Sequence, residues 1–295
     1  MSKTPSVGVA LGGGGVRGFA HVPALETIDA CGIVPTAVAG TSMGALIGAL
    51  YASGKSGREI RRIVDEHSLT PGGGLKEIFA KMDALLGWLR AIRLAWKGTG
   101  LLRADGYVGF LIEQMNAETF ADLKIPLLVV ATDYHSGEPF VFDEGPLRPA
   151  LVASMSIPGV FVPVKHKGRL LVDGGVSNNL PYDLLPDTCD LTAAVDVTPT
   201  REQDDDEDPK AIDATLAMFD ILVDRLTRIK VEAHSPSAYV HPRLVGIRVL
   251  EFEKSQEVLS QAEPAMKEFR SQLLRAVPPD CEGQTKGILP QSPHP

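Results

Sequence analysis

The sequence predicts an α/β fold built on a mostly parallel sheet with helices on its faces. Near the start of the chain, short apolar runs alternate with helical stretches, which is the order that parallel strands and crossover helices require. Two of these runs end in glycine-rich turns that open helices, over residues 12–18 and 40–44. A third observation is the run 125–133 (IPLLVVATD), the most apolar strand candidate in the chain.

Each element follows from its local pattern. The first strand, 6–11, is ended by glycines, and a helix over 19–31 follows it. A second strand, 34–39, leads into a small-residue helix that ends before Gly54. Ser56 and Glu59 form a capping box for the next helix, which reaches about Ser68. The other expected strands are 125–133, 138–142, 169–172, 191–197 and 238–241, and the other expected helices are 75–96, 105–115, 147–156, 211–233 and 254–276.

Composition excludes several classes of protein. The 295 residues are 44% hydrophobic, which rules out disorder of the whole chain. A net charge of −8 argues against nucleic acid as a partner, because phosphate binding needs a basic face. Most of that charge lies in an acidic segment, 201–209, which is interpreted as a solvated loop; a metal site is the alternative. We expect no bound metal and no cofactor.

Cysteine usage and hydropathy predict where the protein resides. Three cysteines, with no metal-ligand spacing, fit a reducing compartment. The apolar run at the start is too short for a signal peptide, and no apolar stretch is long enough to span a bilayer. We therefore expect a cytoplasmic protein that is peripheral to a membrane if it binds one.

The motif Gly40-Thr41-Ser42-Met43-Gly44 matches G-x-S-x-G. It follows a predicted strand and opens a predicted helix, which is the setting of a nucleophile elbow. A strained turn there lifts the Ser42 hydroxyl clear of the sheet, and Gly40 and Gly44 let the strand and helix pack closely. The motif indicates a nucleophilic serine; the alternative is a plain helix N-cap.

The loop 12–18 contains G-x-G-x-x-G at Gly13, Gly15 and Gly18, which favours a dinucleotide site when taken alone. Such a site needs an acidic residue at the end of the second strand, and none is present. The same backbone N–H groups suit an oxyanion. Arg17 is expected to brace this loop. A third motif, Asp173-Gly174-Gly175, follows a strand, where a parallel sheet gathers its site residues; an isolated turn is the alternative.

Together the glycine loop, G-T-S-M-G, the segment 153–164 (ASMSIPGVFVPV) and D-G-G resemble the patatin-like phospholipase family in its bacterial form. The resemblance covers about residues 6–275. It implies a three-layer α/β/α sandwich and lipid acyl hydrolysis by a Ser–Asp dyad without histidine. Carried over by position, Ser42 is the nucleophile and Asp173 the general base, and Gly13, Gly14 and Gly15 line the oxyanion hole. Ser156, where an alanine is common, is expected to have no catalytic consequence.

An ordinary triad would need a histidine after Asp173, but neither His234 nor His241 lies in a motif. The domain prediction is one catalytic domain over 6–275, with core motifs at 8–186 and a disordered tail at 278–295. Within 71–104, the helix 75–96 places Lys76, Lys81 and Arg90 beside an apolar face with Trp88 at its boundary. That pattern suits a lid or membrane contact, and plain packing is the alternative.

The predicted function is therefore a serine hydrolase of lipid carboxylic esters, of phospholipase A, lysophospholipase or esterase type. Its partner is a lipid or ester substrate, and the oligomeric state is left open. Two other classes stay in play. One is a catalytically silent lipid-binding or regulatory protein with the same fold, and the other is a nucleotide-binding protein.

Overall fold

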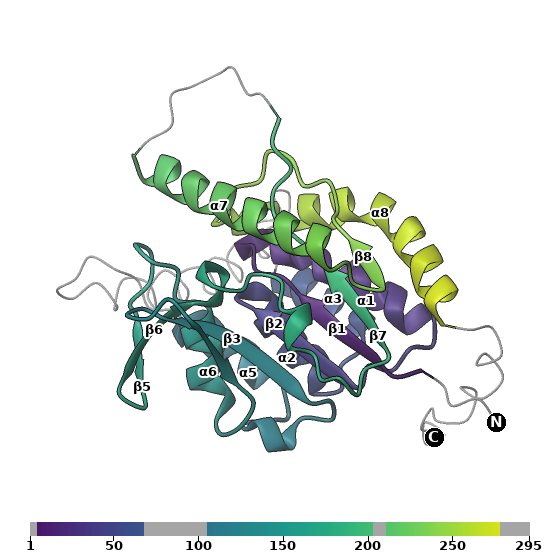
Figure 1. Ribbon diagram of the computed structural model, residues 1–295, viewed down its shortest axis with the longest axis horizontal. Coiled ribbons are helices and arrows are strands. Elements are labelled where there is room, and N and C mark those ends of the chain that lie inside the picture. Colours follow the sequence, from purple (N-terminus) through teal and green to yellow (C-terminus); the bar gives the residue numbers. More distant parts are fainter. Residues whose placement is uncertain (1–4, 68–104, 203–210, 278–295) are drawn as a thin grey trace, which may run out of the picture.

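The computed structural model describes residues 5–67, 105–202 and 211–277. Within these residues, eight strands join in one sheet in the order β5-β6-β3-β2-β1-β7-β8, and β4 also pairs with β3 (Figure 1). The strands are β1 (Val7–Leu11), β2 (Ala37–Thr41), β3 (Leu127–Asp133), β4 (Pro139–Phe142), β5 (Val164–His166), β6 (Arg169–Asp173), β7 (Leu191–Val195) and β8 (Ala238–Val240). The central pairs, from β3 through β2, β1 and β7 to β8, are all parallel. The expected mostly parallel sheet is thus confirmed.

The helices also lie close to their expected places. They are α1 (His21–Ala30), α2 (Met43–Ala52), α3 (Gly57–His67), α5 (Asp105–Glu113), α6 (Leu147–Ser154), α7 (Ala211–Ala233) and α8 (Ser255–Ala276). A 3-10 helix over Gly15–Ala20 precedes α1 and was not expected. The capping box of α3 is formed, because the Ser56 N–H donates to Glu59 Oε2 at 2.8 Å and the Glu59 N–H to Ser56 Oγ at 3.3 Å.

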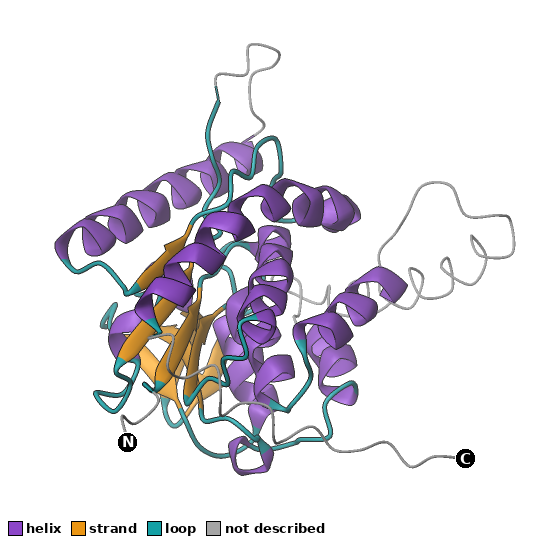
Figure 2. Ribbon diagram, turned by 90° about the vertical axis from the view of Figure 1, so that its right-hand side faces the viewer, coloured by secondary structure: helices purple, strands orange, loops and turns teal. Residues whose placement is uncertain are grey.

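The sheet separates a thick helical layer from a thinner one. Along β1, Val9 and Leu11 join the large core that α1, α2, α6 and α8 share, while Ala10 joins a second cluster with Leu180 and Leu185. Small residues on the second face let the chain that follows β6 pack closely. Figure 2 shows most helices on one side of the strands; α7 belongs to the other side, where Val231 packs on the second cluster.

One topological expectation is wrong. The strand that carries Asp173 was placed in the parallel sheet, but β6 runs antiparallel to β3. It still reaches the site because of its register. Thr41 at the end of β2 pairs with Val130 of β3, and Asp173 at the end of β6 pairs with Ala131. β4 pairs with these two residues of β3 from the other side, so β2 and β6 meet end to end.

Several sequence predictions lie wholly or largely outside the described residues. They are the lid candidate over 71–104, most of the acidic segment 201–209 and the tail 278–295. The division into one domain over 6–275 also stays a prediction. Among the described residues, no helix combines the length and the apolar character needed to cross a bilayer.

Candidate active site

Ser42 occupies the turn between β2 and α2 in a strained conformation. Its φ is +53°, one of two positive values among the described non-glycine residues, and its side chain is almost fully buried. A residue with a Cβ adopts this region at a cost of about 1–3 kcal/mol, which the surroundings must offset. The Ser42 N–H donates to Ser154 Oγ at 2.8 Å, and that hydroxyl donates to the Val130 carbonyl at 2.6 Å. Ser154 thereby ties the elbow to β3.

The glycines on either side of Ser42 are required for close packing. A Cβ on Gly44 would lie 2.2 Å from the Leu11 carbonyl oxygen, and one on Gly40 would lie 2.5 Å from the Cα of Ala45. Both obstacles are backbone, which cannot move aside as a side chain can. The setting expected of a nucleophile elbow is therefore present around Ser42.

The carboxylate of Asp173 is enclosed and only partly hydrogen-bonded. The side chain is 2% exposed, and its Oδ1 accepts the Gly175 N–H at 2.8 Å. Its Oδ2 has no hydrogen-bond partner. Burial raises the pKa of Asp173 to about 6, although the Ser42 hydroxyl and the Gly175 N–H both favour the ionised form. The Ser42 hydroxyl is therefore near enough to affect this carboxylate, which is still ionised at neutral pH.

Gly174 and Gly175, which follow Asp173, help to position its carboxylate. A Cβ on Gly174 would lie 2.2 Å from the Val130 carbonyl oxygen, so only glycine fits against β3 there. Gly175 supplies the N–H that holds Oδ1. The backbone of Asp173 is fixed as well, because its N–H donates to the Ser156 carbonyl at 2.9 Å and its carbonyl accepts from Thr132 Oγ1 at 2.9 Å.

The glycine loop lies beside Ser42, but Gly13, Gly14 and Gly15 differ in whether their N–H groups are already hydrogen-bonded. A Cβ on Gly13 would lie 3.2 Å from Ser42 Cβ, so Gly13 lines the site. Its N–H, however, already donates to the Asn179 carbonyl at 3.1 Å. Of the three glycines expected to line an oxyanion hole, Gly14 and Gly15 are therefore the two whose N–H groups have no acceptor among the described residues.

Backbone geometry explains why Gly15 and Gly18 are glycines without invoking a nucleotide. Gly15 has a φ of +57°, and a Cβ there would lie 2.1 Å from the Val249 carbonyl oxygen. A Cβ on Gly18 would lie 2.3 Å from Met43 Cγ, on the residue after Ser42. Gly15 thus lets the loop pack against the backbone at Val249, and Gly18 lets it pack against Met43 at the start of α2.

Arg17 braces the loop, as expected. Its guanidinium is 1% exposed; Nη1 donates to the Ile247 carbonyl at 3.1 Å, and Nη2 pairs with Asp220 of α7 at 2.7 Å. The buried guanidinium of Arg17 is thus neutralised by Asp220, and this ion pair holds the glycine loop against α7.

Three supporting residues were missed by the sequence analysis. Asn179 accepts the Gly13 N–H through its carbonyl, and its side-chain Nδ2 donates to the Gly13 carbonyl at 3.2 Å. Ser154 holds the Ser42 N–H, as described above. His21 is fully buried and contacts the Gly12 carbonyl through Nε2 at 2.8 Å. Burial lowers the pKa of His21 to about 4, so it is neutral near pH 7 and donates this bond. All three residues lie within or close to a motif of the site, but no spacing in the sequence marks such supporting contacts.

No histidine among the described residues hydrogen-bonds to Ser42 or to Asp173. His241 Nε2 instead contacts the Thr198 carbonyl at 2.9 Å, and His234 is exposed at the end of α7. The parts of the chain that the structure describes also hold no cluster of His, Cys, Asp and Glu suited to a metal ion.

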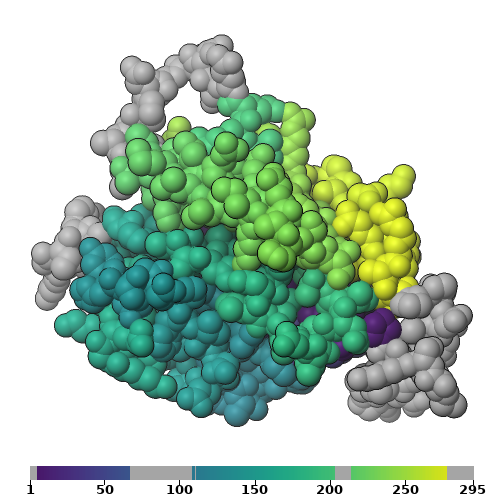
Figure 3. Space-filling view, in the orientation of Figure 1, coloured from purple at the N-terminus to yellow at the C-terminus, as the bar shows by residue number. Residues whose placement is uncertain are grey.

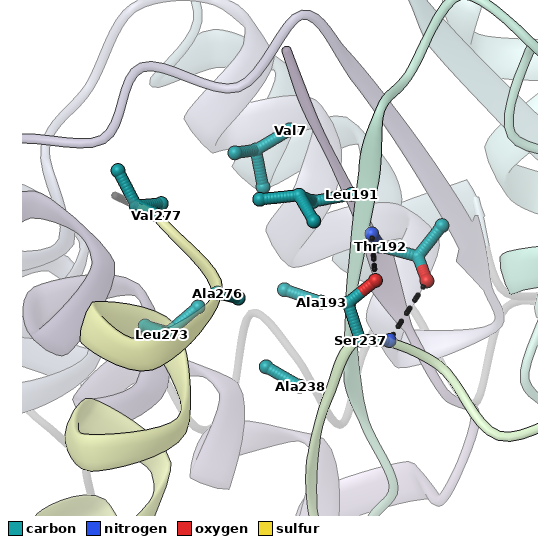
Figure 4. A pocket seen from close by; sticks show the side chains of 9 residues that line it. All are labelled: Val7, Leu191, Thr192, Ala193, Ser237, Ala238, Leu273, Ala276 and Val277. Atoms are coloured by element: carbon teal, nitrogen blue, oxygen red, sulfur yellow. Dashed lines mark hydrogen bonds between the residues drawn. The ribbon is translucent and has the colours of Figure 1, made fainter. Parts of the chain in front are cut away.

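A small pocket lies at the opposite end of the sheet (Figure 4). Val7, Leu191 and Ala238 line it where β1, β7 and β8 begin, together with Leu273 and Val277 at the end of α8. The pocket has room for about one water molecule, and the surface that lines it is apolar. Catalytic chemistry needs polar groups, so this pocket is not a second active site.

The chain resembles known proteins over most of its described length. The model of patatin-like phospholipases matches residues 9–186. An uncharacterized NTE family protein of Mycobacterium tuberculosis is 32% identical over 230 residues, which cover 75% of this chain and 59% of that protein. Patatin-like phospholipase domain-containing protein 7 of Rattus norvegicus is 28% identical over 273 residues, which cover 90% of this chain and 19% of that protein. The chain thus spans less than two thirds of these relatives.

Among solved structures, VipD from Legionella pneumophila superposes with a TM-score of 0.52 at 12% identity, covering 92% of this chain and 67% of that one. That likeness concerns the fold alone and agrees with the α/β sandwich seen here. The family match includes the glycine loop, the Ser42 turn and Asp173, and it spans more than half of the chain. The protein therefore belongs to the patatin-like phospholipase family.

Proposed function

We propose that this protein is a serine hydrolase of lipid carboxylic esters that works through a Ser42–Asp173 dyad. The observation that carries the proposal is the pairing of a strained, buried Ser42 with a buried carboxylate whose Oδ2 has no partner. A nucleophilic serine needs a base within reach, and this free oxygen is the acceptor that the described residues offer.

The proposed reaction has two halves. In the first, Asp173 takes the proton of the Ser42 hydroxyl as Oγ attacks the ester carbonyl. The N–H groups of Gly14 and Gly15 stabilise the negative charge on the carbonyl oxygen. The intermediate then collapses to acyl-Ser42, and Asp173 returns the proton to the departing alcohol. In the second half, Asp173 takes a proton from water as the water attacks acyl-Ser42. The intermediate then collapses, Asp173 returns that proton to Ser42 Oγ, and the fatty acid is released.

Burial makes a carboxylate a better base for this task. A base whose pKa is near the working pH is stronger than an ordinary aspartate and is still largely ionised. The raised pKa of Asp173, about 6, fits that requirement. Activity should consequently rise with pH through about 6 as Asp173 ionises, which a profile of kcat/KM against pH would measure.

The lipid class rests on family membership. The rat relative is named a phospholipase domain-containing protein, and the matching family model bears the phospholipase name. We propose that phospholipids, lysophospholipids or simple lipid esters are the substrates, without a cofactor, in a cytoplasmic setting.

The test compares four variants on esters from short p-nitrophenyl esters to phospholipid vesicles. Ser42→Ala and Asp173→Asn should each lose at least about a thousandfold in kcat, because removing members of a catalytic unit costs that much. Asp133→Asn and His241→Ala are controls, since both residues hydrogen-bond elsewhere. A fluorophosphonate probe should label the wild type and not Ser42→Ala.

Each outcome bears on the proposal. If Ser42→Ala retained its activity, the nucleophile would be wrong. If His241→Ala lost as much as Asp173→Asn, a triad would replace the dyad. A wild type that neither reacted with the probe nor cleaved any ester would be a silent lipid-binding protein instead.

A further inference from the structure

The outer face of α7 carries an apolar stripe that no described residue covers. Five large side chains share this face at spacings of three, four and seven residues, which places them along one side of a helix. We call them the α7 stripe: Met218 (63% exposed), Ile221 (43%), Leu222 (57%), Leu226 (58%) and Ile229 (63%). Figure 3 shows the light green residues of α7 on the face turned toward the viewer. Single exposed apolar residues are ordinary, but a continuous stripe marks a contact surface.

The opposite face of α7 contacts the candidate active site. A Cβ on Gly175 would lie 3.5 Å from the Phe219 ring, and Gly175 is the residue that holds Asp173 Oδ1. Asp220 pairs with Arg17 of the glycine loop. Lys230 donates to the Leu180 carbonyl at 2.8 Å. The helix is therefore fixed to both loops that carry the site, and the stripe faces away from them.

Charge on α7 favours an anionic partner. The acidic residues Asp220 and Asp224 are only 16% and 13% exposed and pair with Arg17 and Arg228. Arg225 lies within the stripe, four residues after Ile221 and four before Ile229; it is exposed and makes no ion pair with any described residue. Arg228, which is 50% exposed, lies at the margin of the stripe. Glu232 is the one exposed acidic residue among the described side chains of α7. Exposed arginines within and beside an apolar stripe favour the interface of an anionic membrane, where they meet lipid headgroups.

We propose that the α7 stripe is a membrane-docking surface, which enters the headgroup region of an anionic lipid bilayer. The proposal rests on the proposed lipid hydrolase function, because docking through α7 would bring the helix that is fixed to both site loops onto the surface of the aggregated substrate. It assigns binding and no chemistry to the stripe. Vesicle binding and hydrolysis of a soluble ester therefore test the two proposals separately.

The experiment measures sedimentation of the protein with phosphatidylcholine vesicles that either contain or lack phosphatidylglycerol. Ser42→Ala serves as the background, so that no lipid is consumed. Leu222→Ser combined with Ile229→Ser should weaken binding at least about tenfold, since each change removes exposed apolar area. Val34→Ser combined with Leu274→Ser is the matched control, because those residues are also exposed but lie away from α7. The control should bind as the background does.

Arg225→Glu tests the charge and leaves the five apolar side chains of the stripe in place. It should lower the preference for phosphatidylglycerol by about fivefold or more, which is the contribution of one basic residue at an anionic surface. In the Ser42 wild-type background, all these variants should hydrolyse p-nitrophenyl butyrate at the unaltered rate, which also verifies that they fold. If the protein with Ser42 intact did not hydrolyse p-nitrophenyl butyrate, the hydrolase proposal would be overturned. The result of the vesicle-binding experiment would be unaffected.

Two outcomes would overturn the docking proposal. One is binding by the stripe variant that equals binding by the matched control. The other is a dimer, detected by light scattering, that the stripe variant converts to a monomer while vesicle binding is absent throughout. The α7 stripe would then be an interface between two copies of the chain.

Discussion

Replacing Asp173 with Asn should stabilise the protein, and the gain should grow with pH. Asn keeps the shape of the side chain and can still accept the Gly175 N–H through Oδ1, while its amide can donate to Ser42 Oγ. What the change removes is a buried negative charge that lacks a cation. Such a charge costs folding free energy whenever the carboxyl group is ionised.

The magnitude follows from the pKa of Asp173, which burial raises from 3.8 to about 6. Because the folded-state pKa is the higher one, wild-type stability is greatest below 3.8 and falls as pH rises toward 6. Above that pH the cost is complete and amounts to about 3 kcal/mol. At pH 5 the cost is about 1.5 kcal/mol, since the folded protein is still largely protonated there. The stabilisation by Asp173→Asn should therefore rise by about 1.5 kcal/mol between pH 5 and pH 8.

Urea denaturation of wild type and variant at several pH values from 5 to 8 measures this difference. Asp133→Asn is the control with the opposite sign. The Asp133 carboxylate accepts the His135 N–H and pairs with Arg169, and these contacts lower the pKa of Asp133. Its contribution is complete above pH 4, so Asp133→Asn should destabilise the protein equally at pH 5 and pH 8. The reasoning fails if the effect of Asp173→Asn does not vary with pH, or if Asp173→Asn destabilises the protein.

Two further predictions concern the Ser42 turn. Gly44→Ala should destabilise the fold by about 3 kcal/mol or more in thermal denaturation, because the added Cβ would meet the Leu11 carbonyl. Gly48→Ala, in the same helix, is the control. Its Cβ would meet a Val38 methyl at 3.1 Å, and it should change stability by about 1 kcal/mol at most. Equal effects of the two would contradict this explanation. Ser154→Ala should lower the free energy of unfolding by about 1–3 kcal/mol and lower kcat for a soluble ester, because it leaves the buried Ser42 N–H without its acceptor. Ser156→Ala removes only a local hydrogen bond to the Val152 carbonyl and should leave kcat unchanged. An unaltered kcat in Ser154→Ala would show that Ser42 does not need this support.

The sequence predicts the fold well where the local pattern and the tertiary contacts agree. The order of β1, α1, β2 and α2 and the turn at Ser42 follow from apolar run length, small residues and glycines, and the structure confirms them. The strand β2 is shifted toward Ser42, to Ala37–Thr41 from the expected 34–39. Its apolar run includes Val34, which is 76% exposed, and only pairing with β1 and β3 selects which part becomes strand.

Strand direction is harder to predict than strand position. The run before Asp173 is apolar whichever way the strand runs. The hairpin in which β5 pairs with β6 through the short turn at Lys167–Gly168 is not among the elements that the sequence predicts. The long-range contacts that support the site are harder still to predict from the sequence. Asn179 reaches Gly13 across 166 positions of the chain, and Arg17 reaches Asp220 across 203, so nothing in local spacing marks either contact.

The antiparallel β6 also explains how a carboxylate can replace histidine in the proposed mechanism. A base carried by a loop at the sheet edge would be open to water, and its pKa would stay near the ordinary value. Asp173 instead ends a strand that meets β2 head on, with Thr132, Gly174 and Gly175 enclosing it. Enclosure supplies the raised pKa that a base for Ser42 requires, and the same enclosure leaves Oδ2 free of competing donors. In the proposed mechanism, the antiparallel β6 at the margin of a mostly parallel sheet is thus the feature that makes a histidine unnecessary.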